Sequence, residues 1–304
     1  MKWKKVGLIF DPAMLSSRQL TCSLMPIVEL VDEAHDIARV YFSPRDLSGR
    51  SQLDYFEIDL KNPSKILKTS ERPLFQHGIL GAFDDSGVTP GSFAMIGNRK
   101  MYYYTGWNLG QTVPFNNSIG VAEFDSKTGV FKRLGDGPIM TRTLHEPYSC
   151  ASPFVMVDSQ KYRMWYASMD QWKKQGEEAL PVYNIKYAES NDGIHWSRNG
   201  HVVLNYEAEG EYAFGRPFVR KEKNVYQMWY SVRGAHYKIG YAESADGLRW
   251  KRMDHLAGIG ASDSGWDSEM IEYPFILDHK QKKYMFYNGN GYGRSGIGLA
   301  ILIE

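Results

Sequence analysis

Cysteine is scarce in this sequence of 304 residues, which contains only Cys22 and Cys150. Two cysteines so far apart form neither a disulfide framework nor the closely spaced ligand set of a structural zinc site. A reduced compartment is therefore expected. We predict no catalytic metal, since the histidines also lack recognisable metal partners, and we predict no cofactor.

An excess of charge of one sign is also absent. Lysine and arginine number 36 and aspartate and glutamate number 35, which gives a formal net charge of +1. A nucleic-acid-binding domain usually carries a basic patch or stripe. The charge balance therefore argues against nucleic acid as a partner.

Long apolar runs are missing as well. No stretch of the sequence approaches the roughly 18 consecutive apolar residues of a membrane-spanning helix. The N-terminus is basic, but its apolar run over 6–10 ends at Asp11 and is too short for the apolar region of a secretory signal. We expect a soluble, cytoplasmic protein without a membrane span.

Aromatic residues, by contrast, are abundant, and many of them belong to a repeat that proline marks at intervals of about 60 residues. Each marker proline is followed by an apolar run, a polar turn, an aromatic strand such as 162–166 and a third strand such as 185–189. In two units an Asp-Gly hairpin then leads to a short strand with Trp196 or Trp250. The marker prolines are Pro26, Pro90, Pro153, Pro217 and Pro274.

Each unit predicts a four-stranded meander, and five such units predict an all-β, five-bladed β-propeller with antiparallel blades. The last unit ends after its third strand, whereas the strand-like segment 4–10 belongs to no unit. We expect 4–10 to pair as the outer strand of the last blade and to close the ring, because closure removes an exposed sheet edge. A single domain over 1–304, without a linker, follows from this pattern.

The residues around the marker prolines are the candidate site, because the first strand of each blade lines the axis of a propeller. Glycoside cleavage needs a protonated carboxylic acid and, in most families, a second carboxylate that acts as base or nucleophile. Carboxylates precede three of the prolines, and an arginine precedes a fourth. These residues are Asp84, Asp85, Glu146, Arg216, Asp267, Glu269 and Glu272.

The loops that follow the second strands are expected to reach the rim of the same pocket. They carry aromatic, amide and cationic side chains, which suit sugar binding, although aromatic residues also serve blade packing. The candidates are Trp107, Asn108, Arg233, Tyr237 and Asn288.

The five-unit pattern and the motif Glu272-Tyr-Pro274 resemble the five-bladed propeller glycoside hydrolases and phosphorylases. That group includes arabinanases and xylosidases, invertases and levansucrases, and β-mannoside phosphorylases. In several of its members a general-acid glutamate stands two residues before a blade proline, which is the position of Glu272. The hydrolases usually also place an aspartate directly before the proline of an early blade. Here those positions hold Met25, Thr89, Ser152 and Arg216.

The resemblance implies an enzyme that cleaves or transfers a glycosidic bond, with Glu272 as general acid, Asp85 as base or nucleophile and Glu269 as a further catalytic candidate. The partner would be a small carbohydrate, an oligosaccharide or an activated sugar. By analogy, a role in bacterial surface-polysaccharide metabolism fits. The predicted substrate-binding residues are Asp84, Trp107, Asn108, Glu146, Arg216, Arg233, Tyr237, Asp267 and Asn288.

Two alternatives to an enzyme stay open. The missing aspartates before the prolines favour a non-catalytic propeller that binds a glycan or a sugar nucleotide. A protein-interaction scaffold would instead require large exposed apolar patches on a blade rim. No oligomeric state follows from the sequence.

Overall fold

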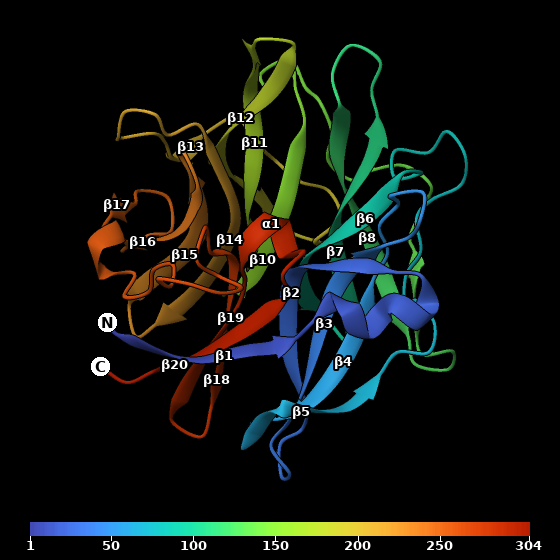
Figure 1. The fold of residues 1–304 in the computed structure, drawn as a ribbon. Helices are drawn as coiled ribbons and strands as arrows, with labels where there is room; N and C mark the ends of the chain where they lie inside the picture. Colours follow the sequence, from blue (N-terminus) through green and yellow to red (C-terminus); the bar gives the residue numbers. More distant parts are fainter.

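The computed structural model describes all residues 1–304, and nearly all of its regular structure is β-strand. The strands form sheets that are arranged around a common centre, as in a β-propeller (Figure 1). The helical segments are limited to two 3₁₀ turns, Pro12–Arg18 and Asp254–Leu256, and the short segment α1 (Asn290–Gly293).

Three sheets have four strands each. The first contains β2 (Thr21–Asp32), β3 (Ile37–Arg45), β4 (Asp54–Asp59) and β5 (Asn62–Thr69). The second contains β6 (Gly87–Ile96), β7 (Arg99–Leu109), β8 (Phe115–Asp125) and β9 (Val130–Arg133). The third contains β18 (Glu272–His279), β19 (Lys282–Asn288), β20 (Ile297–Leu302) and β1 (Trp3–Phe10).

The fourth sheet has eight strands and consists of two meanders. One meander contains β10 (Cys150–Asp158), β11 (Lys161–Gln175), β12 (Glu178–Ser190) and β13 (Val202–Leu204). The other contains β14 (Ala213–Glu222), β15 (Val225–Arg233), β16 (Tyr237–Ser244) and β17 (Lys251–Arg252). A single parallel pair, Tyr183 with Ala213, joins the two meanders, while all other pairs in the sheet are antiparallel.

The first strand of each meander lies at the centre of the molecule. Strands β2, β6, β10, β14 and β18 contact one another in this order, and β18 contacts β2 again. Each of these strands begins with a marker proline or its close neighbours, as the repeat predicts. The residues around the prolines are thereby brought together from four sheets.

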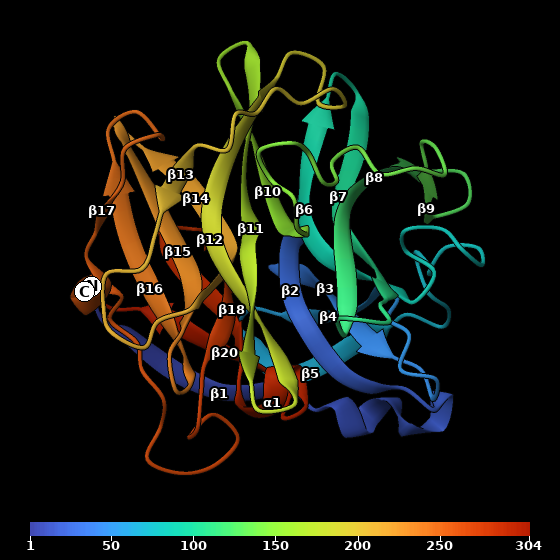
Figure 2. The ribbon, with the colours of Figure 1, turned by 90° about the horizontal axis from the view of Figure 1, so that it is seen from above.

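The first and last strands of the chain pair with each other. Strand β1 runs antiparallel to β20, with Trp3 opposite Leu302 and Phe10 opposite Ile297. The two termini consequently lie side by side at the outer edge of this sheet (Figures 1 and 2). The pairing predicted for the N-terminal strand is confirmed.

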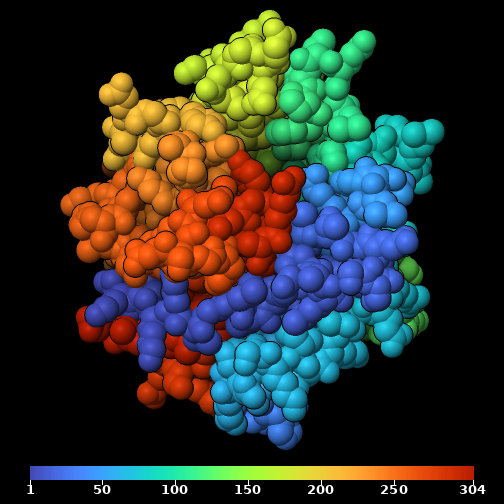
Figure 3. All heavy atoms as spheres, in the orientation of Figure 1, coloured from blue at the N-terminus to red at the C-terminus, as the bar shows by residue number.

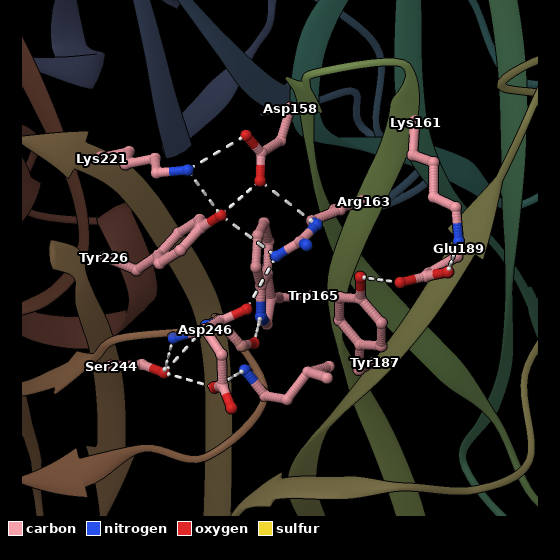
Figure 4. A network of polar contacts seen from close by, with 12 residues as sticks. Asp158, Lys161, Arg163, Trp165, Tyr187, Glu189, Lys221, Tyr226, Ser244 and Asp246 are labelled. Carbon is pink, nitrogen blue, oxygen red and sulfur yellow. Dashed lines mark hydrogen bonds and ion pairs between the residues drawn. The ribbon is translucent and has the colours of Figure 1, made fainter. Parts of the chain in front are cut away.

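Aromatic side chains of one meander form hydrogen bonds to the Asp-Gly hairpin of the next meander. The Trp165 indole N–H donates to the carbonyl of Gly247 at 2.9 Å (Figure 4). Between the meander of β7 and the meander of β12, the Tyr103 hydroxyl donates to the carbonyl of Gly193 at 2.8 Å in the same way. Both glycines have a left-handed backbone, with φ of 77° and 74°, which a residue with a Cβ adopts only at a cost. The hairpins that sequence analysis identified therefore serve as scaffold.

The seam between the β18 and β2 sheets contains a buried carboxylate with three partners, two lysines and a histidine. Asp36 pairs with Lys280 at 2.5 Å, with Lys61 at 2.6 Å and with His279. The hydrogen bonds from Lys280, Lys61 and His279 hold the pKa of Asp36 well below its usual range. Ionised Asp36 therefore stabilises the fold above the pKa of the unfolded chain, and this contribution is lost as the pH falls.

We expect Asp36→Asn to lower the midpoint of urea unfolding at pH 7, because the substitution leaves the ammonium groups of Lys61 and Lys280 around a neutral group. The difference from the wild type should shrink as the pH falls below about 4, where aspartate in the unfolded chain becomes protonated. Urea titrations of both proteins at several pH values measure this. A difference that stays constant with pH would show that Asp36 does not act through its charge.

Candidate functional site

The inner strands are bulged at the marker prolines, and the bulges determine which side chains face the axis. Registers shift at this point in all five strands. A bulge bends its strand and re-aims the neighbouring side chains. In four strands the residue before the proline has a left-handed backbone, which is uncommon for non-glycine residues and concentrates at functional sites. These residues are Met25 (φ 56°), Ser152 (φ 50°), Arg216 (φ 50°) and Tyr273 (φ 56°).

A cavity of about 700 Å³ opens at this end of the inner strands. We call it the axial cavity; its floor includes Met25, Thr89, Ser152 and Tyr273. Its mouth is visible in Figure 3 as a hollow between the red α1 segment and the blue, green and yellow-green loops. No aspartate or glutamate is among the residues that line it. The axial cavity is thus where the sequence placed a pocket, but its lining carries no carboxylate.

Glu272 lies at the start of β18, beside the axial cavity and completely buried, with 0% of its surface exposed. Neither of its carboxyl oxygens has a hydrogen-bond partner. Burial raises the pKa of Glu272 well above its usual value, and the nearby Tyr273 side chain, which does not meet hydrogen-bond geometry, and the charge of Arg233 only partly oppose this effect. The raised pKa favours the neutral carboxylic acid, which is the state that a proton donor requires.

A group of tyrosines connects Glu272 with the axial cavity. The ring of Tyr237 is 6.2 Å from that of Tyr273 and 6.0 Å from that of Tyr292, measured between ring centroids. The charge of Glu272 affects the pKa of all three tyrosines, so they are its near neighbours. Tyr273 and Tyr292 also line the cavity. Two of the tyrosines near Glu272 therefore also line the cavity.

Three other predicted site carboxylates belong to a repeated scaffold motif. In four meanders the last tyrosine of the second strand donates a hydrogen bond to a buried or partly buried carboxylate, which also pairs with a cation. Each carboxylate of this motif therefore has a tyrosine and a cation as partners and links the strands of a blade, although one oxygen of Asp84 accepts no hydrogen bond. In the list that follows, the first distance joins the tyrosine hydroxyl to the carboxylate, and the second joins the carboxylate to the cation. The four motifs are Tyr104–Asp84–Arg133 (3.1 and 2.6 Å), Tyr166–Glu146–Arg198 (2.8 and 2.8 Å), Tyr230–Asp254–Arg252 (2.5 and 2.5 Å) and Tyr287–Asp267–Lys5 (3.0 and 2.6 Å).

The other two catalytic candidates, Asp85 and Glu269, also lie outside the cavity lining. Asp85 accepts hydrogen bonds from the Gly81 amide and the Ser86 hydroxyl, both at 3.0 Å, as a turn-forming aspartate does. Glu269 is exposed in the loop before β18. The structure therefore does not bring a second acidic side chain into the axial cavity, contrary to the expected pair.

Arg216 and Asn288 both connect the inner strands rather than line the cavity. Arg216 is 1% exposed, and its guanidinium donates to the carbonyls of Pro26 at 2.7 Å, Pro90 and Gly91. It has no carboxylate partner, and burial lowers its pKa to about 10. Asn288 is 0% exposed and spans from the Met25 amide to two carbonyl groups. Both were predicted to bind substrate, but in this structure they hold the inner strands together and do not line the cavity.

Of the remaining candidates at the rim, some lie at or beside the axial cavity and one does not. Trp107 lines the axial cavity, whereas Asn108 is half-buried in β7 and does not. Arg233 stacks on Tyr237 and Tyr292, with its guanidinium carbon 5.4 Å from each ring centre, and so joins the group around Glu272. Three of the predicted binding residues, Trp107, Arg233 and Tyr237, thus lie at or beside the cavity.

Sequence analysis missed several residues of the site. Arg45, Phe115 and Tyr292 line the axial cavity. Arg45 ends the second strand of its meander, as Arg233 does in another, so the repeat could have identified it. Tyr292 lies in α1, which has no counterpart in the other meanders, and no repeat position points to it.

No group of three or more His, Cys, Asp or Glu side chains is arranged to hold a metal ion. The helical segments are all too short and too polar to cross a lipid bilayer.

Two curated proteins of Mycobacterium tuberculosis match almost the whole chain. They are "Uncharacterized protein Rv1502" of strain ATCC 25618 / H37Rv and "Uncharacterized protein MT1551" of strain CDC 1551 / Oshkosh. Each is 40% identical over 303 residues, which is 99% of this chain and 99% of the relative. No family model matches the sequence.

Solved structures share the fold at low sequence identity. A structure described as "Glycoside hydrolase" has a TM-score of 0.74 at 20% identity and covers 99% of this chain, with 91% of its own length matched. A "thermostable family-43 glycoside hydrolase" has a TM-score of 0.69 at 15% identity, covering 93% and 91%. A structure described by the words "The GH130 family of mannoside phosphorylases contains glycoside hydrolases that target beta-1,2 mannosidic linkages in Candida mannan" has a TM-score of 0.66 at 16% identity, covering 92% and 84%.

These likenesses confirm the resemblance to propeller glycoside hydrolases at the level of the fold. The chain belongs to the same protein family as the Rv1502 protein of Mycobacterium tuberculosis, and it shares its fold with glycoside hydrolases.

Proposed function

We propose that the protein is a carbohydrate-active enzyme that cleaves or transfers a glycosidic bond at the axial cavity, with Glu272 as the proton donor. The observation that carries this proposal is the burial of Glu272 without any hydrogen-bond or ion-pair partner. A carboxyl group left in this state costs stability, and such groups concentrate at functional sites. Every buried carboxylate of the scaffold motif, in contrast, has a cation beside it.

The chemistry requires a proton for the leaving glycosidic oxygen. A carboxylic acid that stays neutral at pH 7 can supply this proton, whereas an ionised carboxylate cannot. The aromatic faces of Trp107, Phe115 and Tyr273 offer surfaces on which sugar rings can stack. The substrate we propose is a small carbohydrate, an oligosaccharide or an activated sugar.

Access to Glu272 requires a movement, since its side chain is completely buried. Tyr292 has a left-handed backbone (φ 59°) and stands between two glycines that are also left-handed. A non-glycine residue keeps this conformation only where its surroundings hold it. We propose that the Tyr292 side chain moves aside when a sugar enters the cavity and that the sugar then contacts Glu272.

The scaffold we propose for this site is a five-bladed propeller in a single domain over 1–304. The two meanders of the eight-stranded sheet count as separate blades, because only one residue pair joins them. The ring of contacts among the five inner strands supports the same count. A cytoplasmic location and a role in surface-polysaccharide metabolism stay proposals by analogy.

A second candidate function is a non-catalytic propeller that binds a glycan or a sugar nucleotide. The absence of aspartate and glutamate from the cavity lining favours it. Incubation of the wild type with a panel of oligosaccharides and sugar nucleotides, with and without inorganic phosphate, distinguishes the two. We expect release of a reducing sugar or a sugar phosphate. If the protein binds a member of the panel but turns over none of them, the proposed enzyme is wrong and the non-catalytic binding protein takes its place.

A further inference from the structure

We infer that the axial cavity binds an acidic sugar, one that carries a carboxylate or phosphate group, and that Arg45 holds this group. The inference rests on the proposed function, because it names the substrate class of the same cavity. Its basis is the charge and the partners of the residues around the cavity.

Arg45 presents an unoccupied guanidinium to the cavity. It ends β3 and lines the cavity, and its guanidinium carbon is 5.3 Å from the ring centre of Trp107 on the neighbouring sheet. Trp107 is itself fixed, because its indole N–H donates to the Ser51 hydroxyl at 2.8 Å. Stacking on an aromatic face uses the plane of a guanidinium and leaves the N–H groups at its edge free to donate.

Asp46, the acidic residue next to Arg45 in the sequence, already has other partners. Asp46 accepts hydrogen bonds from the amides of Ser48 and Arg50 at 2.9 Å and pairs with the Arg50 guanidinium at 2.9 Å. Asp46 thereby orders the loop between β3 and β4, and the adjacent Arg45 has no carboxylate within ion-pair distance. Arg39, which lies in the same strand, does have such a partner, because it pairs with Glu57 at 2.6 Å.

The lining of the cavity is cationic. Arg45 contributes a positive charge without an ion-pair partner, whereas Asp46 balances the charge of Arg50, and no aspartate or glutamate is among the lining residues. A ligand that fills the cavity takes water away from Arg45, and this is costly unless the ligand supplies a negative charge. Carboxylate and phosphate match the planar fork of arginine in two parallel hydrogen bonds, whereas sugar hydroxyls leave the charge uncompensated.

The rest of the lining suits a sugar ring rather than an anion alone. Phe115 and Tyr292 provide aromatic faces, and Thr89, Asn117 and Ser152 provide groups that hydrogen-bond to hydroxyls. The cavity of about 700 Å³ has room for more than one sugar ring. A uronic acid, a sugar phosphate and the diphosphate of a nucleotide sugar all combine these two features.

Calorimetric binding tests this inference. The ligands are glucuronate, galacturonate, mannose 1-phosphate, glucose 1-phosphate and UDP-glucose, with glucose, galactose and mannose as neutral counterparts and inorganic phosphate as a control. We expect at least one acidic sugar to bind ten times more tightly than its neutral counterpart, and its affinity to fall as salt is added. Arg45→Met should remove this preference and leave the affinity for neutral sugars within threefold. Arg249→Met is the matched control and should change the preference by less than threefold, because Arg249 is exposed and lies outside the cavity lining.

Four results would overturn the inference: failure of every acidic sugar to bind, equal affinity for neutral and acidic sugars, equal loss of both in Arg45→Met, or binding of inorganic phosphate as tight as that of the sugar phosphates. The last would show that the site takes a free anion. Because these are binding measurements, they are separable from the proposed function. If Glu272→Gln still turns over substrate, Glu272 is not the proton donor. A preference for acidic sugars that depends on Arg45 would still hold as a property of the binding site.

Discussion

Glu272→Gln is expected to lower turnover of the glycosidic substrate at least about a hundredfold, because glutamine cannot donate the proton that the leaving oxygen needs. The amide has nearly the shape of the carboxylic acid, so the protein should fold and bind sugar as the wild type does. Steady-state measurements of kcat and KM, together with calorimetric binding, separate these effects. The matched control is Glu269→Gln, since Glu269 is exposed in the preceding loop and does not line the cavity.

The same substitution has a consequence for stability. The pKa of Glu272 is raised in the folded protein, so the native state holds its proton over a range where the unfolded chain has released it. The wild type therefore loses stability as the pH rises from about 4.3, with a slope of up to about 1.4 kcal/mol per pH unit, until the folded pKa is passed. Glu272→Gln should lack this loss. Its stability relative to the wild type should grow with pH over that window, and a constant difference would mean that Glu272 ionises normally.

Glu146→Gln is expected to destabilise the protein by about 3 kcal/mol or more at pH 7, because it breaks a buried charge network. Glu146 accepts hydrogen bonds from Tyr166 at 2.8 Å and Ser168 at 2.9 Å and pairs with Arg198 at 2.8 Å. Lys186, buried beside it at 3.7 Å, would lose a partner as well. Urea unfolding measures the loss, with Glu269→Gln again as control and an expected change below about 0.5 kcal/mol. A small effect of Glu146→Gln would place Glu146 outside the scaffold.

The sequence predicted the order of the strands within the meanders, but not the parallel pair that joins two meanders into one sheet. The marker prolines predicted where the inner strands begin, and the unclaimed segment 4–10 predicted the pairing of β1 with β20. These features follow from local patterns, because alternation, turns and proline positions are properties of short stretches. The cavity at the proline ends followed from the repeat for the same reason.

The division between scaffold and site carboxylates could not be predicted in this way. Asp84, Asp267 and Glu272 all stand shortly before a marker proline and look alike in sequence. They differ in their partners, and the partner of Asp267 is Lys5, which is 262 residues away. Arg133, the partner of Asp84, comes from the last strand of the meander that Asp84 precedes. A missing partner, such as that of Glu272, is a property of the packed structure alone.

The protonation state of Glu272 is the most direct test of the account. Infrared spectra of the wild type and Glu272→Gln at pH 7 should differ by the carbonyl stretch of one protonated carboxyl group, present in the wild type and absent from the variant. Burial without a partner predicts this band. If the difference spectrum instead shows the loss of an ionised carboxylate, Glu272 is charged at neutral pH. That result would contradict both the role of Glu272 as proton donor and the proposed enzymatic function that depends on it.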